Sequence, residues 1–371
     1  MKSFLPLVSV IFGFGMKSKV NTAEFIEDKK CDSGFAEFYK RKIKPNAQRI
    51  EELRMKSLKK LALNARVMVF TPSIILLGIL TYSFAQDLHV SLLDIRVIVL
   101  VGSIILSPVF LISLFFCVTL IYIVLPFQIC DPISKFKQEA SEEFSKIFFE
   151  FFGDFQYEKE RNEDCIIWDY KLFQILPTIP LGRKSSATNT ISGTCRGVSM
   201  HFEDLYIGRE VISISFDVVI TLFKGAAILL NIGNDTGDRT VILQKQFRNW
   251  SFKYRSGLQK VGIEDPEFKK MFDVYSTDDQ RAKNLITTSF ATEFKKLPNL
   301  FRNKKLQASF CDQKLFLALD GSSGLFEFSV FNETDLVKES RFAIERMNEL
   351  LRIVEILRND QRGNSEDRIP N

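Results

Sequence analysis

Residues 97–127 read VIVLVGSIILSPVFLISLFFCVTLIYIVLPF and contain no charged side chain. A helix crosses a bilayer with about 20 apolar residues, so this stretch is long enough to span a membrane. Residues 67–85, VMVFTPSIILLGILTYSFA, form a second uncharged stretch just before it. A helix in a soluble core seldom lacks a charged face over such a length. The sequence therefore predicts two transmembrane helices, 67–85 and 97–127, joined by a short external loop, 86–96.

Charged residues around these stretches predict the orientation in the membrane. Residues 16–66 carry fourteen Lys and Arg against seven Asp and Glu, whereas the loop has Arg96 with Asp87 and Asp94. Basic segments remain on the cytoplasmic side of a membrane. We therefore expect a two-pass protein of the bacterial inner (cytoplasmic) membrane with both termini in the cytoplasm. The lipid bilayer is its first expected partner, with anionic headgroups attracted to the basic arm.

The N-terminal arm, with Lys2, carries a charge of about +8, which exceeds the net charge of +5 of the whole chain. Because the rest of the chain is close to neutral, it has no electrostatic footprint for DNA or RNA, and we expect no nucleic-acid partner. Residues 1–15 resemble the start of a signal peptide but lack a small-x-small cleavage site, so we interpret them as an upstream extension or a weak interfacial anchor. We assign 1–32 to a variable N-terminal extension and 33–66 to a basic juxtamembrane helix.

After the second span the apolar pattern becomes periodic. Asp131-Pro132 predicts a helix start, and apolar residues then recur at helical spacing until Gly153, which predicts a helix over 132–152 packed on the domain's own sheet. Further on, apolar and polar residues alternate as in strands. The predicted strands are CIIWDYKLF, GVSMHFEDLYI, EVISISFDVVITLF and AAILLNI. Two hairpins are predicted over 231–243 and 306–320, and 325–330 is predicted to add a third strand to the second hairpin.

A final helix is predicted over about 334–358, with Ile344, Met347, Leu351 and Val354 as its buried seam. The polar tail 359–371 is expected to be disordered. The fold class is therefore α+β: a two-helix transmembrane hairpin followed by a cytoplasmic domain, 128–358, with a mainly antiparallel sheet flanked by helices. The six cysteines form no CxxC pair, and in the cytoplasm we expect free thiols.

Few side chains are suited to catalysis or ligand binding. His201 lies in a predicted strand with Glu203 on the same face, where the carboxylate could orient the imidazole of a Ser–His or Cys–His site. We favour a histidine that is simply hydrogen-bonded within its strand. The chain has no HExxH, no paired CxxC, no phosphate loop and no GxGxxG after a strand, so we expect no metal and no cofactor.

The densest cluster of carboxylates is EDPEFKKMFDVYSTDD, residues 264–279. Carboxylates before Pro266 suit the N-terminus of one helix, and Ser276 to Asp279 suit the start of a second. Capping accounts for these acidic residues without a metal or a catalytic pair. The alternative is a membrane-bound enzyme that uses carboxylates of the cytoplasmic domain: Glu203, Asp204, Asp278 and Asp279.

This acidic stretch also resembles the signature of a bacterial membrane-protein family known as domain of unknown function 3137. In that family an ED-P-x-F element leads to F-x-V-Y-x-x-D and then to a helix with A-x-x-L-x-T. The matching positions here are Glu264, Asp265, Pro266, Phe268, Phe272, Val274, Tyr275, Asp278, Ala282, Leu285 and Thr287.

Further matches place most of residues 33–358 in the resemblance. They include a glycine-containing strand entry, a strand after an F-K-G turn, and a late hairpin. Their motif positions are Gly193, Gly197 and Glu203; Phe223, Lys224 and Gly225; and Phe326 and Glu327. The chain departs from the pattern at SSATNT before Ile191 and at Ser289. The resemblance implies the fold but no activity, because the family has none assigned.

Architecture and resemblance together favour an uncharacterised integral membrane protein. We expect a membrane-tethered cytoplasmic interaction or regulatory module without catalytic activity. A protein partner or a second copy of the chain would then bind its cytoplasmic domain.

Overall fold

A computed structural model describes eleven parts of the chain. These are residues 24–26, 34–67, 131–161, 175–176, 183–211, 218–233, 239–245, 257–302, 305–321, 326 and 328–366. The chain divides into two compact units. The first comprises Met1–Val20, Gln48–Ala140 and Phe328–Thr334; the second comprises Asn21–Ala47, Ser141–Glu327 and Asp335–Asn371.

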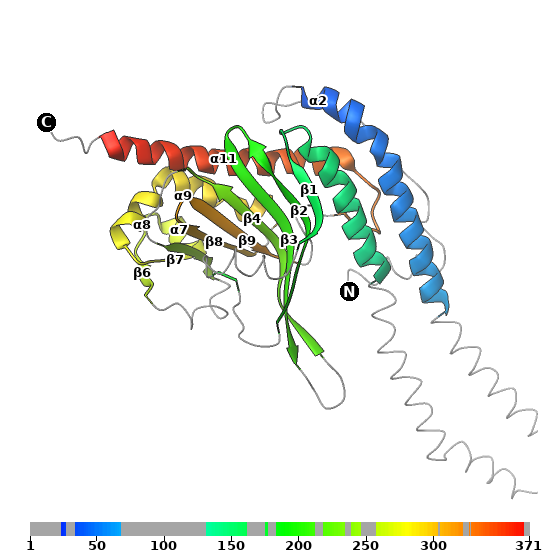
Figure 1. The fold of residues 1–371 in the computed structure, drawn as a ribbon, viewed down its shortest axis with the longest axis horizontal. Helices are drawn as coiled ribbons and strands as arrows, with labels where there is room; N and C mark the ends of the chain where they lie inside the picture. The colour runs from blue at the N-terminus through cyan, green and yellow to red at the C-terminus, as the bar shows by residue number, and fades with distance from the viewer. Residues whose placement is uncertain are drawn as a thin grey trace, which may run out of the picture. The chain divides into compact units, whose positions relative to one another are not determined.

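An antiparallel sheet forms the centre of the second unit (Figure 1). Within the described residues it has nine strands in the order β1-β2-β3-β4-β9-β8-β5-β7-β6. The strands are β1 (Gln156–Arg161), β2 (Arg183–Cys195), β3 (Val198–Val211), β4 (Val218–Asn231), β5 (Thr240–Gln244), β6 (Gln259–Val261), β7 (Phe272–Ser276), β8 (Lys305–Cys311) and β9 (Lys314–Asp320). This confirms the α+β class and the mainly antiparallel sheet.

Helices precede the sheet and are inserted between its later strands. The N-terminal part runs through α2 (Phe35–Phe38), the π-helix Tyr39–Ile43 and the 3-10 helix Lys44–Asn46 into a helix over 47–67. A second helix covers 131–149. The others are α7 (Pro266–Met271), α8 (Asp279–Leu285), α9 (Thr288–Phe294), α10 (Leu297–Leu300) and α11 (Leu336–Glu366).

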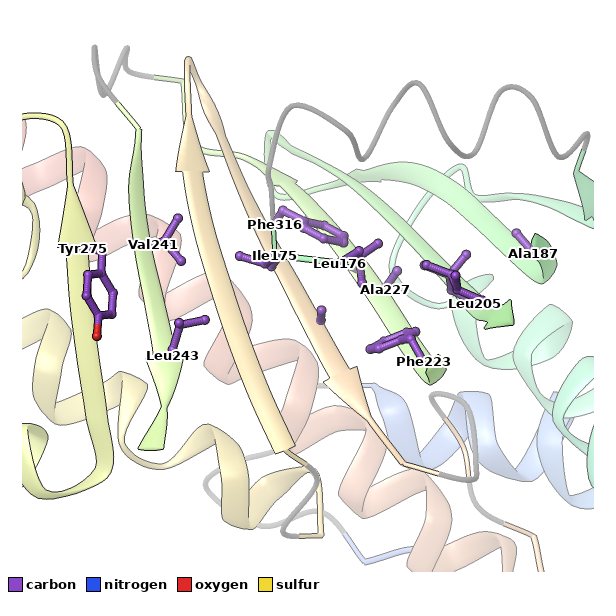
Figure 2. Packing of buried hydrophobic residues seen from close by; sticks show 12 residues of the cluster. Ile175, Leu176, Ala187, Leu205, Phe223, Ala227, Val241, Leu243, Tyr275 and Phe316 are labelled. Carbon is purple, nitrogen blue, oxygen red and sulfur yellow. The ribbon is translucent and has the colours of Figure 1, made fainter. Parts of the chain in front are cut away.

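The two faces of the sheet bury different sets of side chains. Phe310 on β8 is in register with Leu315 on β9, and its ring lies 5.8 Å from that of Phe290 on α9. Side chains alternate along a strand, so Phe316 points to the opposite face. Figure 2 shows Phe316 there, in one apolar cluster with side chains from β2, β3, β4, β5 and β7. Helices therefore cover one face of the sheet, and the cluster in Figure 2 lies on the other.

The predicted helices are largely confirmed. The helix over 131–149 ends near Gly153 as expected, and Phe149 packs on Phe202 of β3 with the ring centroids 5.2 Å apart. All four seam residues of α11 are buried (Ile344, Met347, Leu351 and Val354). The predicted disordered tail is wrong over 359–366, because α11 continues to Glu366 and Thr287 donates a hydrogen bond to Asp360 at 2.6 Å.

The hairpin predicted over 231–243 is wrong. β4 ends at Asn231 and β5 begins at Thr240, but these strands do not pair. Instead β9 occupies the edge of β4, and β5 lies between β8 and β7. The hairpin over 306–320 is confirmed, with β8 and β9 joined at Asp312, whose φ is 53°. Turn residues alone did not reveal which strand would be the neighbour of β4.

The F-K-G turn implied by the resemblance is also wrong. Phe223, Lys224 and Gly225 lie inside β4, which joins the end of the predicted strand 210–223 to the predicted strand 226–232. The start of that first predicted strand, 210–211, belongs to β3 instead. A Cβ atom at Gly225 would meet the carbonyl oxygen of Leu319 at 1.9 Å. The glycine is therefore needed for the close approach of β9 and not for a turn.

Two further strand predictions fared differently. The described residues of 325–330 form no strand; Phe326 packs instead on Phe144, at 5.0 Å between ring centroids. The strand predicted over 165–173 lies outside the described residues, as does the loop 86–96.

No helix in the described part of the chain has both the length and the apolar character needed to cross a membrane. Apart from Val67, the two predicted spans lie outside that part.

Candidate functional site

In the first unit, the helix over 47–67 lies beside the start of the helix over 131–149 (Figure 1). Lys60, in the helix over 47–67, forms an ion pair with Asp131 at the start of the helix over 131–149. The distance from Nζ to Oδ2 is 3.1 Å, and both side chains are about half exposed. An exposed pair of this kind stabilises little by itself. It does show that the C-terminal end of one helix is next to the N-terminal end of the other.

The outer face of the helix over 47–67 is basic and partly apolar near its C-terminal end. Lys56 and Lys59 are exposed, and Leu63 and Val67 are 61% and 52% exposed. On the inner face, the buried side chains of Arg54 and Glu51 form an ion pair at 2.6 Å. Thr334 donates to Glu51 at 2.9 Å, which joins the segment Phe328–Thr334 to this helix.

A chain of hydrogen bonds joins Ser192, His201 and Glu203 in the sheet of the second unit. Ser192 Oγ lies 2.7 Å from His201 Nδ1, and His201 Nε2 lies 3.1 Å from Glu203 Oε2. A carboxylate only accepts hydrogen bonds. We therefore assign the ring proton to Nε2, so that Nδ1 accepts from the Ser192 hydroxyl. The expected pairing of His201 with Glu203 is confirmed, and Ser192 is added to it.

A tight turn sets the register that brings Ser192 to His201. Arg196 and Gly197 both have positive φ, 48° and 73°, and connect β2 to β3 as a two-residue hairpin. Such a turn pairs Cys195 with Val198, and counting back along both strands places Ser192 opposite His201. The dipeptide Arg-Gly between alternating strands was the signal that could have identified Ser192 from the sequence.

The carboxylate is the least exposed member of this chain of hydrogen bonds. Ser192 is partly exposed, the His201 side chain is 19% exposed, and the Glu203 side chain is 0% exposed. Glu203 is paired across the sheet with Ala227, which is fully buried. The carboxylate is thus held inside the protein, while the hydroxyl group and the imidazole belong to partly exposed residues.

The acidic stretch is explained by capping, as predicted. The Asp265 side chain accepts hydrogen bonds from the backbone N–H groups of Glu267 and Phe268, and Asp278 accepts from that of Arg281. Lys295 donates to Asp265 at 2.8 Å; this bond and the backbone bonds hold the pKa of Asp265 below its ordinary value. The two helices are not successive, however, because β7 lies between them.

The four carboxylates of the enzyme alternative are not brought together. Glu203 and Asp204 are neighbours on β3 and therefore point to opposite faces of the sheet. Asp204 accepts a hydrogen bond from Asn189 at 2.8 Å, whereas Asp278 and Asp279 start α8. Within the part of the chain that is described, no group of three His, Cys, Asp or Glu side chains could hold a metal ion. Cys195 and Cys311 are free thiols, as expected for the described cysteines.

Most other motif positions of the resemblance have structural roles. A Cβ at Gly193 would meet the Phe155 ring at 2.6 Å, so this glycine makes room for an aromatic side chain. Glu264 and Pro266 are exposed at the start of α7, and Lys224 is exposed on β4. Glu327 lies outside the described residues. The remaining motif residues are buried in the core: Phe223, Phe268, Phe272, Val274, Tyr275 and Phe326.

Comparison with known proteins agrees with the resemblance. Residues 221–359 match the model of the family described as "Protein of unknown function (DUF3137)". Comparison with curated proteins gives no match. Among solved structures, the chain is similar to the crystal structure of the mycobacterial trehalose monomycolate transport factor A, TtfA. The similarity covers 57% of this chain and 94% of that one, with 15% sequence identity and a TM-score of 0.33.

Proposed function

We propose that this member of the DUF3137 family is a membrane-tethered interaction or regulatory module of the bacterial inner membrane. Its anchor would be the hairpin of the two apolar stretches, 67–85 and 97–127. Both termini and the nine-stranded sheet would be cytoplasmic, where a protein partner or a second copy of the chain would bind.

The Lys60–Asp131 contact is the observation that carries this proposal. A helical hairpin requires the chain to leave and re-enter the cytoplasm at neighbouring points. Lys60 precedes the first apolar stretch by less than two helical turns, and Asp131 follows the second by a few residues. Their ion pair at 3.1 Å supports such a neighbourhood. The exposed Lys56 and Lys59 would then face anionic headgroups, in agreement with the positive-inside rule.

Protease protection of a C-terminal tag tests the tether. In intact spheroplasts the tag should resist added protease, and it should be cleaved after permeabilisation. A matched chain with the same tag inserted in the loop 86–96 should be cleaved in intact spheroplasts. Cleavage of the C-terminal tag in intact spheroplasts, or recovery of the untreated protein in the soluble fraction, would contradict the proposal.

A charge reversal tests the role proposed for the basic arm. The double variant Lys56→Glu/Lys59→Glu should reduce the fraction of chains with a protected C-terminal tag, because the charge bias between arm and loop becomes smaller. Glu52→Gln, on the same exposed side of the helix, should leave that fraction unchanged. Equal protection in all three chains would show that these lysines do not set the orientation.

A further inference from the structure

We propose that Ser192, His201 and Glu203 form a nucleophilic site that cleaves carboxylic esters. Ser192 would be the nucleophile, His201 the general base and Glu203 the residue that orients the imidazole. This activity goes beyond the proposed tethered module and adds a chemical step to its cytoplasmic domain.

Distances in the site match what nucleophilic catalysis requires. An activated serine needs a base within hydrogen-bond reach, and that base needs a third group to fix its orientation. Here these separations are 2.7 Å from Ser192 Oγ to Nδ1 and 3.1 Å from Nε2 to Glu203 Oε2. The two ring nitrogens exchange roles relative to the usual serine triad. The imidazole still presents one unprotonated nitrogen to the hydroxyl and one N–H to the carboxylate, so the function is the same.

The burial of Glu203 distinguishes this site from a polar ladder on a sheet surface. In a surface ladder the carboxylate would be the most hydrated group, because burying a charge is costly. Glu203 is instead fully buried, whereas Ser192 and His201 are both partly exposed. A buried carboxylate stabilises the imidazolium that forms when Nδ1 takes the serine proton, since charges interact more strongly away from water.

Neighbouring positions on the same face of the sheet indicate an apolar acyl group. His201 is paired with Leu229 on β4, and Leu229 with Phe316 on β9. Both residues belong to or pack against the apolar cluster of Figure 2. None of these side chains offers a charged partner for a substrate. The expected substrate class is therefore an ester of an uncharged, apolar carboxylic acid.

The reaction balances without any further reagent than water. Ser192 Oγ attacks the ester carbonyl carbon while its proton passes to His201 Nδ1. The bond from that carbon to the alcohol oxygen breaks, and His201 returns the proton to the leaving alcohol. Water, deprotonated by His201, then attacks the acyl-serine, and the carboxylic acid leaves as Ser192 regains its proton. The net change is ester plus water to acid plus alcohol.

A fluorophosphonate probe tests the proposal on the full-length chain in detergent micelles. The wild-type protein should be labelled, and peptide mass spectrometry should locate the adduct at Ser192. Ser192→Ala should abolish the adduct. Glu203→Gln should slow labelling at least tenfold, because the imidazole loses its fixed tautomer. Ser199→Ala is the matched control, since Ser199 is exposed on the same hairpin opposite Thr194 and should not alter labelling.

Two results would overturn the assignment. One is a folded wild-type protein that acquires no adduct at Ser192, which is decisive even if the variants are unstable. The other is an adduct at Ser192 whose rate is unchanged in both Glu203→Gln and His201→Gln. Hydrolysis of p-nitrophenyl butyrate by wild-type protein but not by Ser192→Ala would support turnover beyond a single acylation. None of these results depends on the orientation measured by tag protection.

Discussion

Asp265 contributes most of the stability that the acidic stretch provides. It caps α7 through two backbone N–H groups and pairs with Lys295 at 2.8 Å, where both side chains are mostly buried. Loss of a capping side chain costs about 1 kcal/mol, and loss of the ion pair adds to it, so Asp265→Ala should lower the free energy of unfolding by about 1–2 kcal/mol. Urea denaturation of the wild type and the variant measures this difference.

The pH dependence of that contribution has a definite sign. Folding lowers the pKa of Asp265 below its ordinary value of 3.8, mainly through the Lys295 hydrogen bond. The stabilisation by the Asp265 carboxylate is therefore present above pH 3.8 and is lost as the pH falls through the lowered pKa of the folded protein. Asp279→Ala is the control: Asp279 is exposed and pairs only with Lys283 in the described structure, so its loss should cost little. Equal costs for the two variants would contradict the capping account.

Among the glycines that the structure describes, Gly225 is the one at which a methyl group has least space. The Cβ of Gly225→Ala would lie 1.9 Å from a backbone oxygen of β9, so the two central strands would have to separate. We expect a loss of about 3 kcal/mol in the free energy of unfolding. Gly262→Ala is the control, because nothing lies within 4 Å of its Cβ, and it should change stability by less than about 0.5 kcal/mol. Thermal unfolding of the two variants compares them directly.

Helices α9 and α11 meet through a pair of carboxyl groups. Burial and a hydrogen bond to Glu293 raise the pKa of Glu349 on α11 to about 7. Burial by itself would raise the pKa of Glu293 on α9. Hydrogen bonds from Glu349 and Lys296 outweigh this effect and lower the pKa. Arg352 also lies 3.2 Å from Glu293. Below about pH 7 the proton therefore resides on Glu349, which can donate it to Glu293 on the other helix.

This pair predicts a pH-dependent contact between the helices. Because folding raises the pKa of Glu349 from 4.5 to about 7, the contribution of the Glu349 proton is complete below pH 4.5 and is lost as the pH rises through 7. Glu349→Gln should reduce this loss, since an amide donates at every pH. Denaturation midpoints between pH 5 and pH 8 measure it. Glu355→Gln, at an exposed position of α11, should retain the wild-type dependence; the same flattening in both variants would exclude the pair as its cause.

Local signals in the sequence predicted the elements whose partners are close along the chain. The caps at Asp265 and Asp278, the α11 seam and the β8–β9 hairpin all follow from residues within a few positions of one another. The sheet order does not. It depends on which strands bury complementary faces, and β5 has better partners in β7 and β8 than in β4. Likewise, the contact between His201 and Glu203 could be predicted because they lie two residues apart on one strand. The contact between Ser192 and His201 could be predicted only from the register of the hairpin that pairs β2 with β3.

Asn21–Ala47, which precede the first apolar stretch, belong to the same compact unit as the sheet. Phe35 is fully buried, and its ring lies 4.9 Å from that of Phe151, after the helix over 131–149. Phe25 packs on Phe35 at the same distance. The fold of the second unit therefore needs chain from both sides of the predicted hairpin.

A truncated chain should reveal this requirement. Residues 131–371 alone lack the segment 21–47, so they should unfold at a lower temperature than the full chain and bind more of a hydrophobic dye. Adding a peptide of residues 21–47 should raise the unfolding temperature of the fragment. The same peptide with Phe35→Ser should raise it less. A fragment as stable as the full chain, with or without the peptide, would show that this segment is dispensable.

The neighbourhood of β4 and β9 has a consequence for how the protein is made. Strands β1 to β4 form a meander, each pairing with the next along the chain, so they can assemble as soon as they leave the ribosome. The other edge of β4 must wait until β5 to β8 have been translated and β9 appears. During that interval an apolar strand edge is open to any other nascent chain. A pause in translation before Lys314 would lengthen that interval and should increase aggregation.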